Sequence, residues 1–292
     1  YGSRASNGVI IITTKKGQKG QKAKVSYNGN VSVGIVNKTL DVMDTSEYLP
    51  YIKDLVMKSR GYDEAAYLAS PEYAALGYTD AQGNHVFADT DWQKEIYRTA
   101  VSRDHNVTIA GGLKNMPYRV SIGYTDQNGV VKKSDYQRYT ASVNMSPSLA
   151  NGILTFNIKV KGMYSKTNWN SGSAIYNSLA MDPTKPIYDT RADNGYAGYW
   201  QWPSTASWAD TQWKANKNSL APQNPVAALE LYDCTGKTKS LVGNIEVLYK
   251  LHGLEDLQFH VNAGMDLTSG KSNTQQSPYS FDNYYYGFYS NS

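Results

Sequence analysis

Few residues in this sequence have the types and spacing that catalysis or metal binding would need. There are four histidines and one cysteine among 292 residues. His252 and Glu255 stand three residues apart, but no third ligand follows at a spacing typical of a metal site. The lone Cys234 excludes an internal disulfide and a cysteine metal cluster. We therefore predict that the protein is not an enzyme and that it carries no metal and no cofactor.

Three further motifs have ordinary structural explanations. Residues 2–8 contain glycines but lack the Gly-Lys-Ser/Thr ending of a phosphate-binding loop. The Asp-Gln-Asn-Gly sequence at 126–129 lacks the remaining acidic ligands of a calcium loop, and Asn-Gly is a common turn dipeptide. The basic run at 15–22 is the one concentrated positive stretch in a chain of net charge +4. We interpret it as a solvated connector, and we expect no nucleic-acid partner.

An aromatic cluster is the best candidate for a binding site. Its rings stand among Gly, Ser, Asn and Asp, and aromatic faces beside amides and carboxylates suit a sugar or peptide ligand. The candidate contact residues are Tyr196, Tyr199, Trp200, Trp202, Trp208 and Trp213. The alternative is that these rings pack their own loop or contact a partner protein, which is what large aromatic side chains in ordered loops more often do.

The elements that must position this cluster are strands. Apolar and polar residues alternate with a period of two, as in strands that present one apolar face. The predicted strands cover residues 24–35, 105–110, 118–125, 137–145, 154–161, 241–252 and 257–267. A shorter apolar run at 8–14 predicts a strand buried on both faces. On the strand at 257–267, His260 shares the polar side with Asn262 and Asp266, which favours polar packing over catalysis.

The connections between these strands alternate in length. Residues 111–117, 146–152 and 252–256 are short links, whereas residues 36–103 and 167–239 are long. Within the first long link, residues 48–59 and 91–97 are predicted helices, and Thr45-Ser46-Glu47 resembles a helix cap. Short turns on one side and long loops on the other are typical of an outer-membrane barrel. Alternation alone also fits any half-buried antiparallel sheet in a soluble protein.

Composition agrees with a surface between apolar and wet surroundings. The sequence has 25 Tyr against 5 Phe, with 18% charged residues. No stretch approaches the roughly 18 consecutive apolar residues of a membrane helix. Tyrosines near the predicted strand ends are candidates for an aromatic girdle at a membrane interface. They are Tyr27, Tyr118, Tyr124, Tyr139, Tyr164 and Tyr249.

The first 17 residues, YGSRASNGVIIITTKKG, resemble the end of the plug domain in SusC/RagA-type TonB-linked outer-membrane transporters. Segments that are similar to the same family follow in the same order. They are residues 90–93, 118–124, 126–129, 136–142, 182–189 and 224–230. The resemblance therefore extends over essentially the whole chain, and its most specific part is the plug-end motif.

The resemblance implies an all-β fold, a partial transmembrane antiparallel β-barrel with short helices in its extracellular loops. Residues 1–17 would end the plug domain, and residues 18–292 would form the N-terminal part of the barrel, with about seven strands and two long extracellular loops. A complete member has a barrel of about 22 strands around its plug. These residues alone are expected neither to close a barrel nor to transport anything.

The family also implies a function and partners. The expected function is TonB-dependent import of an oligosaccharide or peptide across the outer membrane of a Gram-negative, Bacteroidetes-like cell. The expected partners are a SusD-like surface lipoprotein, which the aromatic cluster could also contact, the TonB complex, and outer-membrane lipid. Two alternatives remain open: a barrel or surface adhesin that does not transport, and a soluble carbohydrate-binding module.

Overall fold

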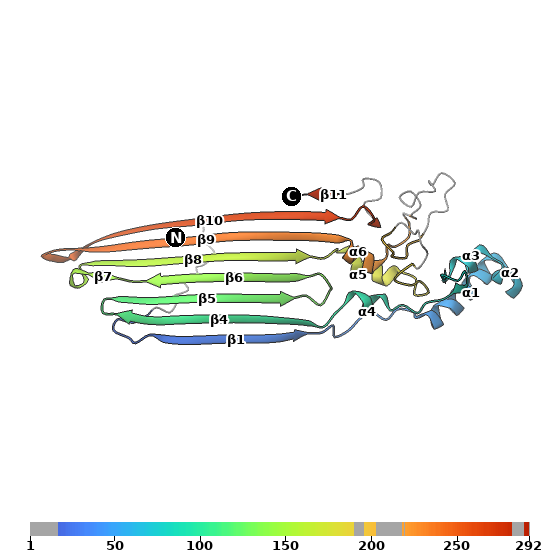
Figure 1. The fold of residues 1–292 in the computed structure, drawn as a ribbon, viewed down its shortest axis with the longest axis horizontal. Coiled ribbons are helices and arrows are strands. Elements are labelled where there is room, and N and C mark those ends of the chain that lie inside the picture. The colour runs from blue at the N-terminus through green and yellow to red at the C-terminus, as the bar shows by residue number, and fades with distance from the viewer. Residues whose placement is uncertain (1–16, 190–195, 203–217, 219, 282–288, 292) are drawn as a thin grey trace.

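The computed structural model describes residues 17–189, 196–202, 218, 220–281 and 289–291 (Figure 1). In these residues nine strands form one antiparallel sheet in the order β1-β4-β5-β6-β8-β9-β10-β11, with β7 beside β8. The strands are β1 (Lys24–Gly34), β4 (Ala100–Leu113), β5 (Met116–Asn128), β6 (Asp135–Met145), β7 (Ser148–Leu149), β8 (Leu154–Trp169), β9 (Tyr232–Leu251), β10 (Leu254–Gln276) and β11 (Tyr289–Asn291). Strands β2 (Tyr78–Thr79) and β3 (His85–Val86) pair separately.

The register gives the sheet two chemically different faces. Directly paired residues lie on the same face, so each cross-strand row can be followed through the sheet. One such row runs through Tyr27, Val107, Ile122, Ala141, Gly162, Leu241 and Leu267. The face that carries this row is apolar and exposed: Ile122 is 64% exposed, and Val261 on the same face is 62% exposed. An apolar surface of this extent is typical of contact with another apolar phase.

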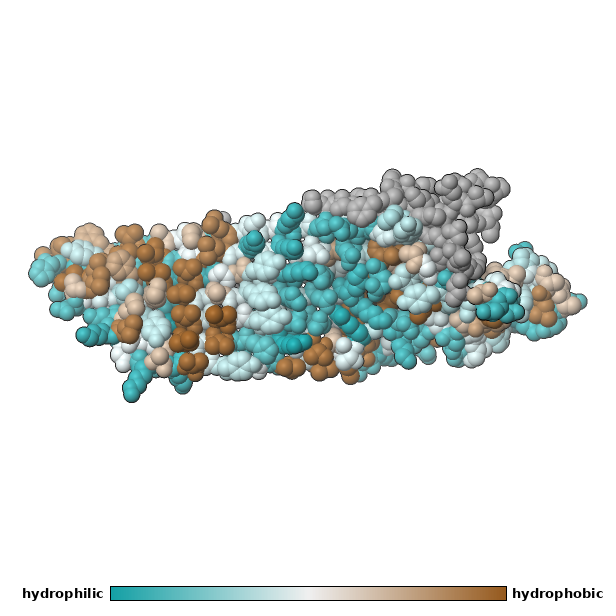
Figure 2. Space-filling view, in the orientation of Figure 1, coloured by the Kyte–Doolittle hydropathy of each residue, from teal (hydrophilic) through white to brown (hydrophobic). Residues whose placement is uncertain are grey.

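Tyrosines mark one border of the apolar face. Tyr124, Tyr139 and Tyr164 are paired neighbours in one row, with ring centroids 5.0 and 6.3 Å apart. At the other border Tyr249 stacks on Phe259, with centroids 6.4 Å apart. From Leu154 to Tyr164 the strand rises about 33 Å, and a tilt near 45° reduces this to about 23 Å, close to the roughly 25 Å height of a membrane-barrel apolar band. Figure 2 shows this band in brown next to a hydrophilic zone in teal.

The seven strands predicted from alternation are confirmed, but most extend further toward the long loops than predicted. The strand predicted at residues 8–14 lies outside the described residues. Residues 162–169 belong to β8 and residues 232–240 to β9, although the sequence analysis placed most of them in a loop. The physical reason is the change in composition between the tyrosine row and the long loops, where the face that carries the apolar band becomes polar. In that zone Asp126, Gln137 and Lys166 are paired neighbours. With polar residues on both faces, the alternation that signals a strand disappears.

The helices lie at one end of the sheet and the short turns at the other (Figure 1). They are α1 (Thr45–Arg60), α2 (Glu64–Leu68), α3 (Pro71–Ala75), α4 (Trp92–Ile96), α5 (Ser173–Ala180) and α6 (Pro225–Glu230), and a 3₁₀ turn η2 (Ala150–Gly152) follows β7. Helices α1 and α4 confirm the two predicted helices. The cap of α1 is Asp44, however, whose side chain accepts a hydrogen bond from the Glu47 amide.

None of the helices in the described part of the chain has the length and apolar character needed to cross a membrane as a helix. At the short-turn end, Gly253 joins β9 to β10 with a φ of 81°, a conformation that favours glycine. Gly112 allows the connector after residue 17 to approach closely, because a Cβ there would collide with the Gln18 carbonyl. The Gly112 amide also donates a 2.9 Å hydrogen bond to the Gln21 carbonyl, so the connector is held at this end.

Charges placed on the apolar face should impair assembly according to depth. We expect Ile158→Asp, near the middle of the band, to lower the amount of folded complete receptor more than Phe156→Asp, nearer its border. A basic residue at mid-depth of a membrane barrel costs about 2–4 kcal/mol, an acid less, and either costs little at the border. Asn144→Asp, on the polar face between Arg119 and Lys159, is the control. Equal surface levels of all three variants would contradict the assignment of Ile158 and Phe156 to the lipid-facing side of the sheet.

Candidate functional site

The two long connections join into one layer beyond the strands. Backbone hydrogen bonds run from the Ala88 amide to the Thr184 carbonyl and from the Thr90 amide to the Pro183 carbonyl, both 3.0 Å. The Trp92 indole nitrogen donates to the Asp182 carbonyl at 3.0 Å. These bonds tie the connection between β1 and β4 to the connection between β8 and β9. Each connection therefore depends on the other for its shape.

Lys185 lies at the centre of this layer. Its residue is 1% exposed, and its ammonium donates hydrogen bonds to the carbonyls of Ala75 and Gly77. The ammonium also lies 4.8 Å from the ring centroid of Trp200 and 4.2 Å from that of Trp202, within cation–π range. Burial lowers the pKa of Lys185 to about 8, against the raising effect of the Asp182 carboxylate. The group is therefore charged at neutral pH and binds three segments of the layer together.

The structure describes four of the six aromatic candidates. Tyr196 and Trp200 are buried, at 6% and 5% exposed, and Tyr199 and Trp202 are half-buried against the cluster that contains Trp200. Trp200 and Trp202 meet edge to face with centroids 5.0 Å apart. Trp208 and Trp213 lie outside the described residues.

Three of the four described rings take part in one packed cluster: Trp200 is buried in it, and Tyr199 and Trp202 lie against it. The buried cluster that contains Trp200 also contains Trp92, Met181 and Val226. Contact with cargo or with a lid protein stays a prediction. Of the described rings, the half-buried Tyr199 and Trp202 are the ones that keep some open surface.

Asn224 supports the same layer and is 0% exposed. Its side-chain oxygen accepts hydrogen bonds from the Val226 and Ala227 amides, which caps α6. Its amide group donates to the carbonyls of Ile187 and Trp200. Neither Asn224 nor Lys185 was predicted from the sequence as a positioning residue. The Asn-Pro pair that opens α6 is a signal that could have identified this helix, since Asn caps helices and Pro favours their first position.

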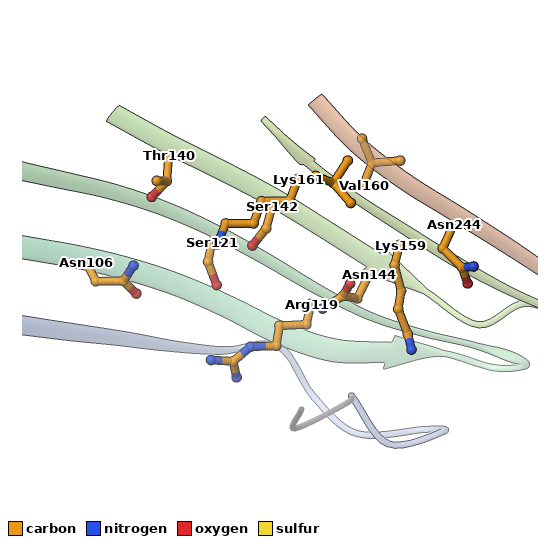
Figure 3. A pocket seen from close by; sticks show the side chains of 11 residues that line it. Asn106, Arg119, Ser121, Thr140, Ser142, Asn144, Lys159, Val160, Lys161 and Asn244 are labelled. Carbon is orange, nitrogen blue, oxygen red and sulfur yellow. The ribbon is translucent and has the colours of Figure 1, made fainter. Parts of the chain in front are cut away.

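The polar face of the sheet carries a second candidate surface, a hollow of about 600 Å³ (Figure 3). It is lined by Asn106, Arg119, Ser121, Thr140, Ser142, Asn144, Lys159, Val160, Lys161, Val242 and Asn244, which come from strands β4 to β9. Amides and hydroxyls surround three cations, and no carboxylate is among these described lining residues. Such a surface can hydrogen-bond a polar partner and favours one that carries negative charge.

Two histidines in the described part of the chain lie beside carboxylate residues. His260 lies on the polar face, and its Nε2 is 2.6 Å from a Glu246 carboxylate oxygen, so the predicted polar packing is confirmed. His252 and Glu255 are exposed and lie at the tight turn between β9 and β10. In the described ranges, no group of three or more His, Cys, Asp or Glu residues is arranged to hold a metal ion.

The architecture is that of one wall of a β-barrel with an apolar outer band and a polar inner face. No family model matches the sequence. The TonB-dependent receptor SusC of Bacteroides thetaiotaomicron is 46% identical over 291 residues, which are 99% of this chain and 27% of SusC. The TonB-dependent receptor P3 of Formosa agariphila is 34% identical over 145 residues, 50% of this chain and 12% of P3.

Solved structures of the RagAB peptide importer share the fold. In its closed-closed state the TM-score is 0.66 at 19% identity, over 95% of this chain and 31% of that chain. A second structure of the RagAB peptide transporter gives a TM-score of 0.64 at 20% identity, over 95% and 32% of the two chains. The chain is a SusC/RagA-type TonB-dependent receptor sequence, and it spans about a quarter of the length of SusC.

Replacing Lys185 should loosen the loop layer. We expect Lys185→Met in the complete receptor to speed proteolytic cleavage of the long loops on intact cells. The carbonyls of Ala75 and Gly77 would lose their donor. Gly77 is buried, and leaving a buried group unsatisfied costs about 1–3 kcal/mol. Lys58→Met is the control, because its side chain is 75% exposed and its one ion pair among the described residues is with Asp54 on the helix surface. Equal cleavage rates for the two variants would contradict the role of Lys185.

Proposed function

We propose that these residues form part of the barrel wall of an active importer in the outer membrane. The importer takes up a large nutrient, an oligosaccharide or a peptide, with energy from TonB and with a SusD-like surface lipoprotein. The observation that carries the proposal is the two-faced sheet, whose bare apolar band suits lipid and whose inner face suits a polar lumen. Two relatives named as receptors and one named as a peptide importer support it.

The edges of the sheet support a larger barrel. Strand β1 pairs with β4 on one side and has no partner on its other side among the described residues. A lipid-facing sheet cannot keep an open row of backbone donors and acceptors, because nothing in the hydrocarbon satisfies them. The rest of the receptor would therefore supply the strands that close the wall. Residues 1–17 would end the plug, and residues 18–292 would belong to the barrel.

The polar hollow gives the inner face a role in this proposal. Arg119, Lys159 and Lys161 would face the plug or the cargo path, where their charges attract polar and anionic groups. This proposal requires no catalytic step from the residues of the barrel wall. The protein is proposed to bind and move its cargo unchanged, without acting as an enzyme.

Energy-dependent uptake tests the proposal. Cells that produce the complete receptor would be offered fluorescent oligosaccharides and peptides of graded length, with and without TonB. We expect one of the two cargo classes to accumulate inside the outer membrane only when TonB and the receptor are both present. Surface binding that persists without any TonB-dependent accumulation would contradict transport and favour the adhesin or carbohydrate-binding alternative.

A pair of tryptophan variants separates cargo contact from packing. We expect Trp202→Ala to raise the cargo concentration needed for half-maximal uptake by about tenfold while surface levels stay normal, because loss of one stacked ring costs about 1–3 kcal/mol. Trp200→Ala, in the buried cluster, should instead lower surface levels. Unchanged half-maximal uptake for Trp202→Ala would assign that ring to packing alone.

A further inference from the structure

A row of lysines crosses the outer face just beyond the tyrosine border. Lys166 of β8 pairs with Lys237 of β9, and Lys237 pairs with Lys271 of β10. Lys239 lies on the same face of β9, in the row of Tyr164. Directly paired side chains have Cβ atoms about 5 Å apart, and like charges at this distance destabilise a sheet. We name Lys166, Lys237, Lys239 and Lys271 the lysine row.

Around the lysine row, the acidic side chains form ion pairs with cations that are not part of the row. Arg103 is 3.8 Å from Asp126, and the two are paired neighbours in the row that continues to Lys166. Asp135 forms an ion pair with Arg98, and Asp233 pairs with Lys133 at 2.9 Å. The acids near the lysine row are thus already committed to other cations. Among the described residues, no ion pair or hydrogen bond engages a side chain of the lysine row.

The height of the lysine row indicates what would neutralise it. Lys239 is level with the tyrosines, and the three paired lysines lie two residues further out, about 7 Å along the strands. Tyrosine girdles lie at the boundary between acyl chains and head groups. The lysine ammonium groups therefore reach the layer in which lipid head groups carry their phosphates.

We propose that the lysine row binds the phosphate groups of outer-leaflet lipid. The site rests on the proposed function only in that it requires the sheet to face a membrane. Four flexible cations on three adjacent strands can surround a phosphate monoester, and the anion removes the repulsion between the lysines. The apolar band directly below would contact the acyl chains of the same lipid molecule, so head group and tail are bound by one continuous surface.

The test uses the purified complete receptor in neutral detergent. Lipid A that carries phosphate monoesters, and the same lipid A after enzymatic dephosphorylation, would be titrated in, and bound lipid counted by native mass spectrometry. The compared variant is Lys166→Gln/Lys237→Gln/Lys271→Gln. The control is Lys38→Gln/Lys58→Gln/Lys94→Gln, which removes the same charge from exposed positions in the first long connection. A heat-dependent shift in gel mobility checks that each barrel is folded.

We expect the parent receptor to prefer phosphorylated lipid A. The lysine-row variant should bind it about a hundredfold more weakly, since each lysine near an anionic surface contributes about a fivefold factor. The control should bind as the parent does. Equal binding by the lysine-row variant, or equal binding of the two lipids by the parent, would overturn the proposal. So would displacement of the lipid by millimolar inorganic phosphate, which would point to a free anion as the ligand.

A failure of the transporter proposal would show itself differently. A receptor that binds phosphorylated lipid through the lysine row but does not accumulate cargo would leave the lipid site intact and contradict import. Loss of lipoprotein co-purification in the lysine-row variant, with lipid preference unchanged, would identify the row as a protein-docking surface and overturn the lipid assignment.

Discussion

Antiparallel pairing in a nearly unbroken register governs the arrangement of this molecule. From β1 to β10 each residue faces a fixed partner, and the one irregularity among these ladders lies between Leu254 and Gln258, beside a tight turn. Side chains alternate strictly along a strand, so a slip of one residue would exchange the two faces. Slipping β8 by one residue would place Lys159 and Lys161 in the apolar band and bury Val160 against the polar side. Such a slip would mix apolar and charged side chains on both faces, which disfavours any register but this one.

The same pairing also determines which residues of different strands lie at the same height along the sheet. It brings Tyr124, Tyr139 and Tyr164 level with one another although they are far apart in the sequence. On the outer face, mostly apolar residues occupy the rows on one side of this border, and polar and charged residues occupy the rows on the other. The lysine row is a consequence of this arrangement, because only pairing places Lys166, Lys237 and Lys271 together. Beyond the strands, Lys185 and Asn224 hold the long connections in one layer through buried hydrogen bonds.

Much of the fold could be predicted from alternation, because one face of the sheet is apolar and the other is polar. Alternation located the seven strands, and the segregation of short and long links indicated the barrel. It failed for the outer half of β9 and the end of β8, where both faces are polar. The candidate site was less accessible to prediction. The burial of Trp200 depends on contacts from the other long connection, and the partners of Lys185 are backbone carbonyls more than a hundred residues away.

The most direct measurement of the central claim is an accessibility scan along β8 in the complete receptor reconstituted in lipid. Cys234 would be replaced by Ser, and single cysteines at each position from 156 to 163 would carry a nitroxide spin label. Collision rates with oxygen, which concentrates in the hydrocarbon, should be high at Ile158 and Val160 and low at Lys159 and Lys161. A period of two with this phase is the predicted result. Uniform rates, or a period of two with the opposite phase, would contradict a lipid-facing apolar band.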